Sequence, residues 1–277
     1  MKLLKPAFWT KKASLFSILL WPLSLVYQFF FYVTALISKE RNFKIPIICV
    51  GNIYLGGTGK TPLALFLMKI FEQQGKKTSI VKKYYPEHFD EHYMIKNYTK
   101  NLFLNKNRQV ALDDAEKNNF DIAILDDGFQ DLSIKKNLSI LCFNSNQLEG
   151  NGFTFPSGPL RERMSSIKRA NIILINGKKN VAFEKKIISI SNKVEIFYSN
   201  YEPINIKEFK NKNVLAFAGI GNPDNFFKML IKNNINIKKK LTFPDHYEFS
   251  KHEIEKIVNE SLEKNLIILT SEKDYYR

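Results

Sequence analysis

The sequence predicts an α/β fold: a mostly parallel sheet flanked by helices, preceded by an N-terminal apolar helix and followed by a smaller second α/β unit. Short apolar runs typical of buried strands alternate along the chain with segments of helical periodicity. The first of these strand-like runs, at residues 45–50, leads into a glycine-rich turn and then a helix, an order typical of parallel α/β folds. Functional residues are therefore expected at the carboxyl ends of the strands.

Each element of the main unit has its own sequence signal. A helix is expected over residues 62–74, ending near Gly75, because its apolar positions recur at helical spacing. Strands are expected where apolar and β-branched residues are concentrated between turn signals, at residues 45–50, 78–81, 121–125, 138–143, 171–175 and 194–198.

A second alternation begins after Pro203. It comprises a strand at residues 214–218, a glycine turn, a helix through 226–231 and a last strand at 266–269. We therefore expect three parts in the chain. These are a membrane-associated helix in residues 1–40, a nucleotide-binding domain in residues 41–205, and a smaller α/β domain in residues 206–277.

Composition narrows the class of partner. The 277-residue chain is 44% hydrophobic, enough for a packed core, and its formal net charge of +15 favours polyanionic partners. Many lysines lie in stretches such as 207–212 and 232–240, which are typical of a solvated face, so no nucleic-acid partner is expected. Cys49 and Cys142 lie in apolar runs, which predicts two buried reduced thiols rather than a disulfide or zinc site.

The segment Leu15–Ile37 carries no charged residue. As a helix it would be about 35 Å long, enough to cross a bilayer core of about 30 Å. Lysines flank both ends, so charge does not set an orientation. Ser17, Trp21, Ser24 and Gln28 form a weak polar stripe, which also permits a helix lying in the membrane interface or packed on its own domain. A signal peptide is disfavoured because the apolar stretch is too long.

Residues 51–61 read Gly-Asn-Ile-Tyr-Leu-Gly-Gly-Thr-Gly-Lys-Thr and have the chemistry of a nucleotide phosphate loop. Gly56, Gly57, Thr58 and Gly59 allow backbone N–H groups to converge on phosphate oxygens. The following Lys60 supplies a mobile cation, and the hydroxyl of Thr61 can ligate Mg²⁺. The loop is a variant of the P-loop, because Tyr54 stands where the standard spacing has a glycine. It predicts binding of a nucleoside triphosphate.

Two acids follow an apolar strand in Ile-Ala-Ile-Leu-Asp-Asp-Gly-Phe-Gln. Asp126 and Asp127 occupy the strand end where P-loop proteins keep the carboxylate that serves Mg²⁺. An ordinary Asp-Gly turn would need only one acidic residue, so a role for this pair in metal binding is favoured. Further along, Pro-Ser-Gly-Pro-Leu-Arg-Glu offers Arg161 as an anion clamp and Glu162 as another Mg²⁺ ligand.

An ordered set of motifs resembles the tetraacyldisaccharide 4'-kinases, the lipid A 4'-kinases of Gram-negative bacteria. The set is Val-Gly-Asn with Gly-Gly-Thr-Gly-Lys-Thr-Pro, then Leu-Asp-Asp-Gly-Phe-Gln, Gly-Pro-Leu-Arg-Glu, Ala-Gly-Ile-Gly-Asn-Pro, Phe-Pro-Asp-His and Ser-Glu-Lys-Asp. The resemblance implies transfer of the ATP γ-phosphate to the 4'-hydroxyl of a tetraacylated glucosamine disaccharide 1-phosphate. It further implies Mg²⁺ and the cytoplasmic face of the bacterial inner membrane. No obligate protein partner is evident from the sequence.

The same resemblance implies roles for individual residues. Lys60 and Thr61 would serve the phosphates and Mg²⁺, Gln130 the nucleotide surroundings, and Asp126, Asp127 and Glu162 the metal region. Asp90 would be the catalytic base, oriented by His246. Lys60 would be the third catalytic residue. Where the family has Ser-Arg-Gly-Tyr, this chain reads Lys82-Lys83-Tyr84-Tyr85.

Two other classes share parts of the pattern. A membrane-associated partitioning or targeting ATPase would also combine a phosphate loop, paired acids and membrane contact, but its loop carries a lysine before the glycine pair, where this chain has Leu55. A soluble cofactor-biosynthetic kinase or ligase would leave the apolar segment Leu15–Ile37 without a role. The choice between ATP and GTP, the acyl-chain preference and the oligomeric state have no sequence signal.

Overall fold

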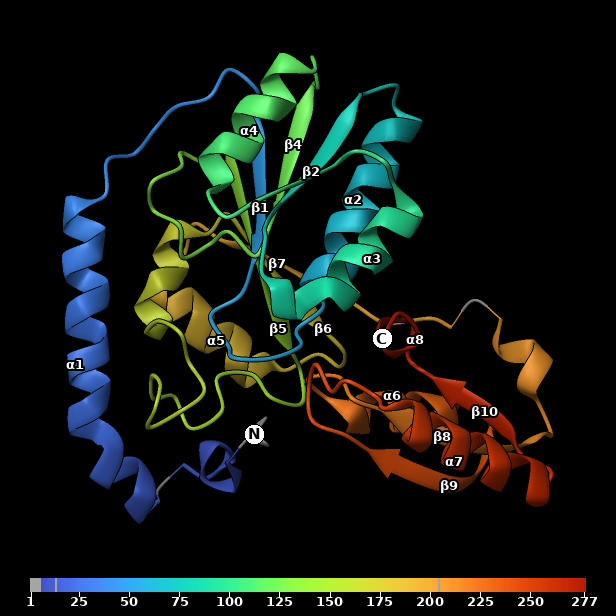
Figure 1. Cartoon of the computed structure of the whole chain (residues 1–277). Coiled ribbons are helices and arrows are strands. Elements are labelled where there is room, and N and C mark those ends of the chain that lie inside the picture. The colour runs from blue at the N-terminus through green and yellow to red at the C-terminus, as the bar shows by residue number, and fades with distance from the viewer. Residues whose placement is uncertain (1–5, 13, 204) are drawn as a thin grey trace. The chain divides into compact units, whose positions relative to one another are not determined.

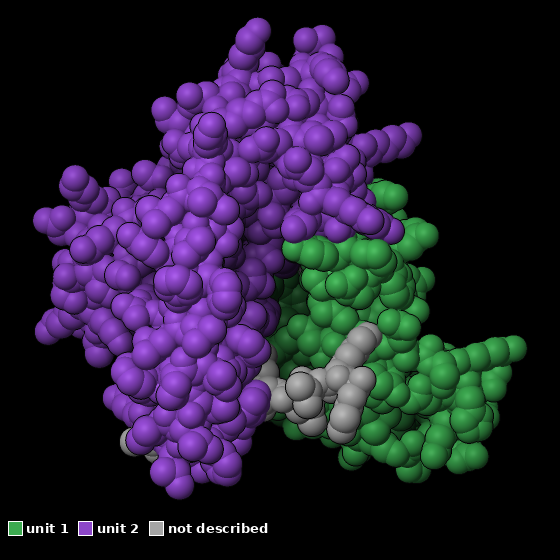
Figure 2. Space-filling view, turned by 60° about the vertical axis from the view of Figure 1, so that its left-hand side comes forward, with its two compact units in different colours: residues 1–4, 85–97, 201–277 green, residues 5–84, 98–200 purple. Residues whose placement is uncertain are grey.

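The computed structural model describes residues 6–12, 14–203 and 205–277 (Figure 1). These residues form two compact units, coloured separately in Figure 2. The larger unit contains the described residues from 6 to 84 and the segment Tyr98–Asn200. The smaller unit contains Tyr201–Arg277 together with Tyr85–Asn97. The early segment Tyr85–Asn97 thus belongs to the same unit as the C-terminal residues.

The larger unit is built on a seven-stranded sheet in which every neighbouring pair is parallel, so the predicted fold class is confirmed. The strand order is β3-β2-β4-β1-β5-β6-β7. The strands are β1 (Ile47–Gly51), β2 (Thr78–Lys83), β3 (Leu102–Asn105), β4 (Ile122–Asp126), β5 (Leu138–Asn144), β6 (Ile172–Asn176) and β7 (Glu195–Ser199). The four-residue edge strand β3 was not expected from the sequence.

Helices cover both faces of this sheet. The chain moves one way along the sheet from β1 to β3 and back from β3 to β4, and right-handed crossovers therefore put α2 and α4 on opposite faces. Residues from α4 and α5 share one hydrophobic cluster with the inner strands. Cys49 and Cys142 are buried free thiols in β1 and β5, and burial raises the pKa of each to about 12. The helices are η1 (Ala7–Thr10), α2 (Lys60–Gln73), α4 (Arg108–Lys117), η3 (Met164–Arg169) and α5 (Val181–Ile190).

Helix α1 (Leu15–Ile37) is attached to the larger unit by its polar stripe. Ser24 Oγ donates to the carbonyl oxygen of Thr154 over 2.9 Å, and Gln28 Nε2 donates to Thr154 Oγ1 over 2.6 Å. Ser17 Oγ accepts a 3.0 Å bond from Asn151. Most of the large apolar side chains of α1 are exposed, and only 11% of its most apolar window is buried. Helix α1 is therefore not a buried core helix.

The smaller unit has a three-stranded parallel sheet in the order β10-β8-β9. Two of its strands were expected; β9 was not, because its lysine-rich sequence lacks an apolar run. In the structure β9 is an edge strand whose Lys238 and Lys240 are exposed, as edge strands with lysines commonly are. Its elements are η2 (Pro86–His88), α3 (Phe89–Tyr98), η4 (Ile206–Phe209), β8 (Asn213–Ala218), α6 (Pro223–Lys232), β9 (Asn236–Thr242), α7 (Lys251–Glu263), β10 (Ile267–Thr270) and α8 (Glu272–Tyr275). The last residue of α3, Tyr98, belongs to the larger unit.

Candidate active site

The phosphate loop connects the carboxyl end of β1 to the start of α2, as the sequence predicts. Gly59 has a left-handed φ of 92°, which lets the chain turn directly into the helix at Lys60. Two asparagines hold the loop. Asn52 Nδ2 donates to Gly56 O and to Thr58 Oγ1, and Asn176 Nδ2 at the end of β6 donates to Thr58 O. Neither asparagine was singled out from the sequence, although Asn52 lies inside the motif.

Thr61 and Asp126 meet at the carboxyl edge of the sheet. Thr61 Oγ1 donates to Asp126 Oδ2 over 2.9 Å, because β1 and β4 are adjacent and both end there. The Asp126 side chain is fully buried, and its Oδ1 atom has no hydrogen-bond partner in the described part of the chain. A buried carboxylate oxygen without a donor beside a threonine hydroxyl is the donor set that Mg²⁺ uses in phosphate-loop proteins, so these two residues fit the metal.

Lys82, near the end of β2, is a further neighbour of Asp126. Its Nζ lies 2.6 Å from Asp126 Oδ2, and its side chain is only 6% exposed. The sequence analysis gave Lys82 no role in the site. The long-range pairing of β2 with β4, in which Lys82 stands opposite Asp126, brings the two together.

Asp127 adopts a left-handed φ of 57° directly after β4, which turns its side chain away from the path of Asp126. Its carboxylate accepts hydrogen bonds of 2.9 and 3.1 Å from Arg161 Nη1, and Lys60 Nζ lies 3.7 Å away. Burial raises the pKa of Asp127, but the charges of Lys60, Arg161 and Lys82 outweigh it, and the net shift is well below the ordinary value. Asp127 is therefore ionised at neutral pH.

Gln130 and Glu162 form the side of the site next to Asp127. Gln130 Nε2 donates to Asn52 O over 2.9 Å and to Glu162 Oε1 over 3.1 Å, and Arg169 forms an ion pair with Glu162. Gln130 thus links the phosphate loop to Glu162. Within the described residues, no three His, Cys, Asp or Glu side chains are grouped so that they could hold a metal ion by themselves. Mg²⁺ commonly uses only one or two carboxylates together with substrate phosphates and water.

A second polar cluster lies within the smaller unit, around Asp90 of α3. His246 Nδ1 lies 3.1 Å from Asp90 Oδ2, and the Asp90 side chain is 1% exposed. Arg277 contacts the same oxygen through Nε at 2.7 Å and Nη2 at 2.6 Å. Lys273 Nζ, at the start of α8, lies 3.1 Å from His246 Nε2 and 2.9 Å from Glu91. The structure therefore brings together the two residues that the resemblance paired.

The electrostatics of this cluster keep Asp90 ionised. Burial disfavours the carboxylate, but the hydrogen bond from His246 and the charges of Lys273 and Arg277 outweigh it and lower the pKa of Asp90. Burial also lowers the pKa of Lys273, but Glu91, Asp245 and Asp90 raise it to above its ordinary value. Lys273 and Arg277 were not expected in the site. Lys273 lies in the motif Ser-Glu-Lys-Asp, which was the available signal.

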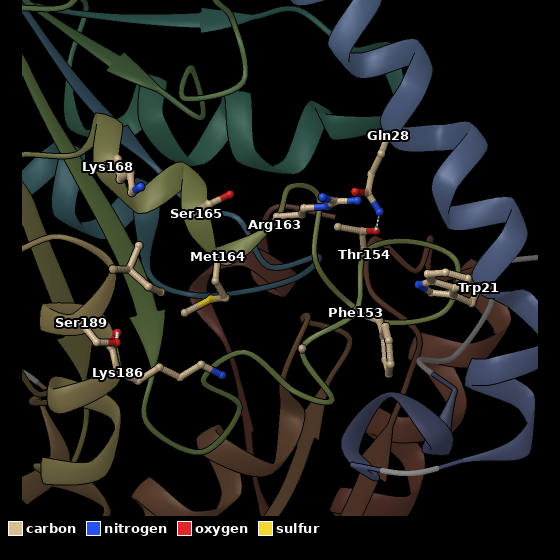
Figure 3. Close-up of a pocket in the computed structure, with 12 residues that line it drawn as sticks. Trp21, Gln28, Phe153, Thr154, Arg163, Met164, Ser165, Lys168, Lys186 and Ser189 are labelled. Carbon is tan, nitrogen blue, oxygen red and sulfur yellow. Dashed lines mark hydrogen bonds between the residues drawn. The ribbon is translucent and has the colours of Figure 1, made fainter.

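An amphipathic groove of about 660 Å³ in the larger unit is lined by α1 and by residues of the segments 152–154, 163–168 and 186–190 (Figure 3). Trp21 and Gln28 of α1 line one wall, where Gln28 is hydrogen-bonded to Thr154. The remaining lining residues include apolar Phe153, Met164 and Ile190 and three cations, Arg163, Lys168 and Lys186. The groove thus places positive charge beside the exposed apolar helix.

A parallel sheet with a glycine-rich phosphate loop and a Thr61–Asp126 pair at the adjacent strand end is the arrangement of nucleotide-binding proteins of the P-loop class. The family can be named more closely. The family model for tetraacyldisaccharide-1-P 4'-kinase matches residues 16–277, and the chain belongs to this family. It is therefore a kinase of lipid A biosynthesis, and the comparisons favour this reading over a partitioning ATPase or a cofactor-biosynthetic enzyme.

Curated tetraacyldisaccharide 4'-kinases match this chain over most of their own length. The chain is 42% identical over 285 residues to a tetraacyldisaccharide 4'-kinase of Pelagibacter ubique, covering 100% of this chain and 89% of the relative. It is 31% identical over 293 residues to the Rickettsia rickettsii protein of the same name, covering 100% and 90%. The crystal structure of LpxK from Aquifex aeolicus in complex with ATP has the same fold, with a TM-score of 0.66 at 24% identity over 94% of this chain and 89% of that one.

Proposed function

We propose that this protein transfers the γ-phosphate of ATP to the 4'-hydroxyl of tetraacyldisaccharide 1-phosphate and forms lipid IVA. In this step the hydroxyl oxygen bonds to the γ-phosphorus, the bond to the β-phosphate oxygen breaks, ADP leaves, and the hydroxyl proton passes to a base. The observation that carries the proposal is the Thr61–Asp126 pair with its unpartnered Oδ1, beside Lys60, in a chain that matches the kinase family over residues 16–277.

The phosphates are the ligands proposed for the loop. The backbone N–H groups of Gly56, Gly57, Thr58 and Gly59 would hold them, with Lys60 as a mobile cation. Gln130 would fix the loop against the nucleotide through its bond to Asn52. These interactions position the γ-phosphate, and positioning supplies most of the catalysis in phosphoryl transfer.

Thr61 Oγ1 and Asp126 Oδ1 would hold Mg²⁺, with Asp127 and Glu162 in the surrounding metal region. When bound, Mg²⁺ neutralises charge on the phosphate oxygens. Arg161, which fixes Asp127, adds a further cation next to Lys60. The metal assignment is better supported for Asp126 than for Glu162. Asp126 has a carboxylate oxygen without a hydrogen-bond partner among the described residues, whereas the carboxylate of Glu162 contacts Gln130 and Arg169.

Asp90 is the proposed proton acceptor and His246 the residue that orients it. A carboxylate with a lowered pKa is a weak base, but it is fully ionised at neutral pH and can take a proton late in the reaction. In the loose transition state of phosphoryl transfer the nucleophile is deprotonated late, so a weak base suffices.

We further propose that α1 lies in the membrane interface rather than crossing the bilayer. Its polar stripe is bonded to the loop around Thr154, whose backbone polar groups would have no water in a hydrocarbon core. The opposite, apolar face of α1 is exposed, and the cations Arg163 and Lys168 are near it in the groove and suit anionic headgroups. Because the reaction consumes ATP, the membrane surface proposed is the cytoplasmic face of the inner membrane.

The direct test is a phosphoryl-transfer assay. Purified full-length protein is incubated with Mg²⁺, γ-labelled ATP and the tetraacyldisaccharide 1-phosphate, and the extracted lipid is examined for label. A labelled lipid with the phosphate at the 4'-position is expected. ATP hydrolysis without any labelled lipid would overturn the proposal and favour a nucleotide-gated ATPase.

A further inference from the structure

Lys82 is a buried cation in the middle of the proposed magnesium site. Its Nζ contacts Asp126 Oδ2 at 2.6 Å, and the same oxygen accepts the hydroxyl of Thr61 at 2.9 Å. The side chains of Lys82 and Asp126 are 6% and 0% exposed. Water therefore screens this pair little.

Charge is unevenly distributed around the two aspartates. Lys82 faces Asp126, while Lys60 and Arg161 face Asp127. Three cationic side chains thus accompany two carboxylates before any nucleotide is present. Such a site attracts a polyanion, but it opposes the approach of a free divalent cation.

We propose that Lys82 is the counter-cation of Asp126 in the nucleotide-free protein, where it competes with a free divalent cation for this carboxylate. The proposal rests on the magnesium site proposed above. A divalent ion held by Thr61 and Asp126 Oδ1 shares its carboxylate with the Lys82 ammonium, and the two like charges repel across a few ångströms of buried space. A bound triphosphate makes the net charge of the site negative. The metal is therefore expected to bind readily only together with the nucleotide.

Mn²⁺ binding to the nucleotide-free, full-length protein tests this competition. Mn²⁺ is a spectroscopic substitute for Mg²⁺, and its free fraction is measured by electron paramagnetic resonance. Lys82→Met keeps the length of the side chain without its charge, and is expected to lower the Kd for Mn²⁺ at least tenfold. Lys82→Arg keeps the charge and should bind Mn²⁺ as weakly as the wild type.

Lys83→Met is the matched control, because it removes the same charge from the next position of β2, which points to the other face of the strand. Its Kd should change less than twofold. An unchanged Kd in Lys82→Met, or an equal gain in Lys83→Met, would overturn the proposal. If Lys82→Met does not fold, as judged by its thermal melt, Lys82→Gln supplies a neutral donor and must show the same tightening.

Two further measurements locate the effect. Adding Asp126→Asn to Lys82→Met should abolish the gained Mn²⁺ affinity; a retained gain would mean that the metal binds elsewhere and would reject the proposal. Lipid labelling by the wild-type protein is measured in parallel. If the wild type labels the lipid but Lys82→Met does not change Mn²⁺ binding, only the proposed competition is rejected. If the wild type labels no lipid, the proposed function itself is rejected.

Discussion

Nε2 of His246 lies 3.1 Å from Nζ of Lys273. An ammonium group can only donate, so Nε2 is the acceptor in this contact and the ring proton is on Nδ1. That proton points at Asp90 Oδ2, 3.1 Å away. Lys273 therefore selects the histidine tautomer that donates to Asp90, and a residue without a role in the sequence analysis sets the hydrogen-bond direction in the proposed catalytic pair.

The first prediction concerns this pair. Asp90→Ala and His246→Ala should each lower kcat by roughly 10²–10⁴ with little change in the KM for ATP, because a general base contributes about that much. The double variant should fall hardly further, since the two residues act as one unit. Steady-state kinetics of the three variants tests this. Strictly additive losses in the double variant, or near wild-type kcat in Asp90→Ala, would contradict the pairing. Glu87→Ala, on the neighbouring helical turn, is the control and should keep its activity.

The second prediction is a pH dependence. The folded pKa of Asp90 lies below its unfolded value of about 3.9, so its stabilising contribution is present above the unfolded value and is lost as pH falls through the folded one. Arg277→Met removes a cation from Asp90 and should raise that pKa. The acidic limb of the pH profile of kcat/KM should then move to higher pH. An unshifted limb, or an equal shift in the exposed-site control Lys264→Met, would argue against Asp90 as the titrating base.

The third prediction concerns the phosphate loop. Lys60→Ala should abolish measurable turnover and weaken ATP binding, because the mobile cation for the phosphates is lost, while the thermal melt stays close to that of the wild type. Lys69→Ala, on the exposed face of the same helix, is the matched control and should retain activity. Wild-type turnover in Lys60→Ala would remove the role assigned to the loop.

The fourth prediction separates metal from phosphate binding. Asp126→Asn should raise the Mg²⁺ concentration needed for half-maximal activity by about tenfold or more, since an amide oxygen is a weaker ligand than a carboxylate. Titration of activity with Mg²⁺ at saturating ATP measures this. The same treatment of Asp113→Asn, a surface acid paired with Arg41, should leave the titration unchanged.

The fifth prediction concerns α1. Replacing the exposed Phe29 and Phe30 by Glu should weaken binding to vesicles of phosphatidylethanolamine and phosphatidylglycerol at least tenfold, because it puts charge on the apolar face. Phe66→Glu, which alters a similarly exposed phenylalanine on α2, is the control. Vesicle sedimentation provides the measurement. Wild-type protein that resists alkaline extraction from membranes would contradict an interfacial helix and favour a spanning one.

Local sequence determined much of the fold. Each strand expected in the main sheet is present with ends within two residues, because apolar β-branched runs bounded by turn residues have few other ways to bury their side chains. The phosphate loop was also predictable, since its glycines, Lys60 and Thr61 are contiguous in the chain. The strand β3 was missed because it has only four residues, and β9 because its lysine-rich sequence lacks an apolar run.

What only the tertiary structure decided are the contacts between residues far apart in the chain. Asp90 and His246 are separated by 156 positions, and Lys82 and Asp126 by 44. Periodicity reports which face of an element is buried but not which element covers it, so Lys82, Asn176 and Arg277 carried no local signal for their roles. Likewise, the apolar sequence of α1 did not show that its polar stripe is bonded to the loop around Thr154. The physical reason is that the partner of each polar group depends on strand order and loop packing. Both are established only when the chain folds.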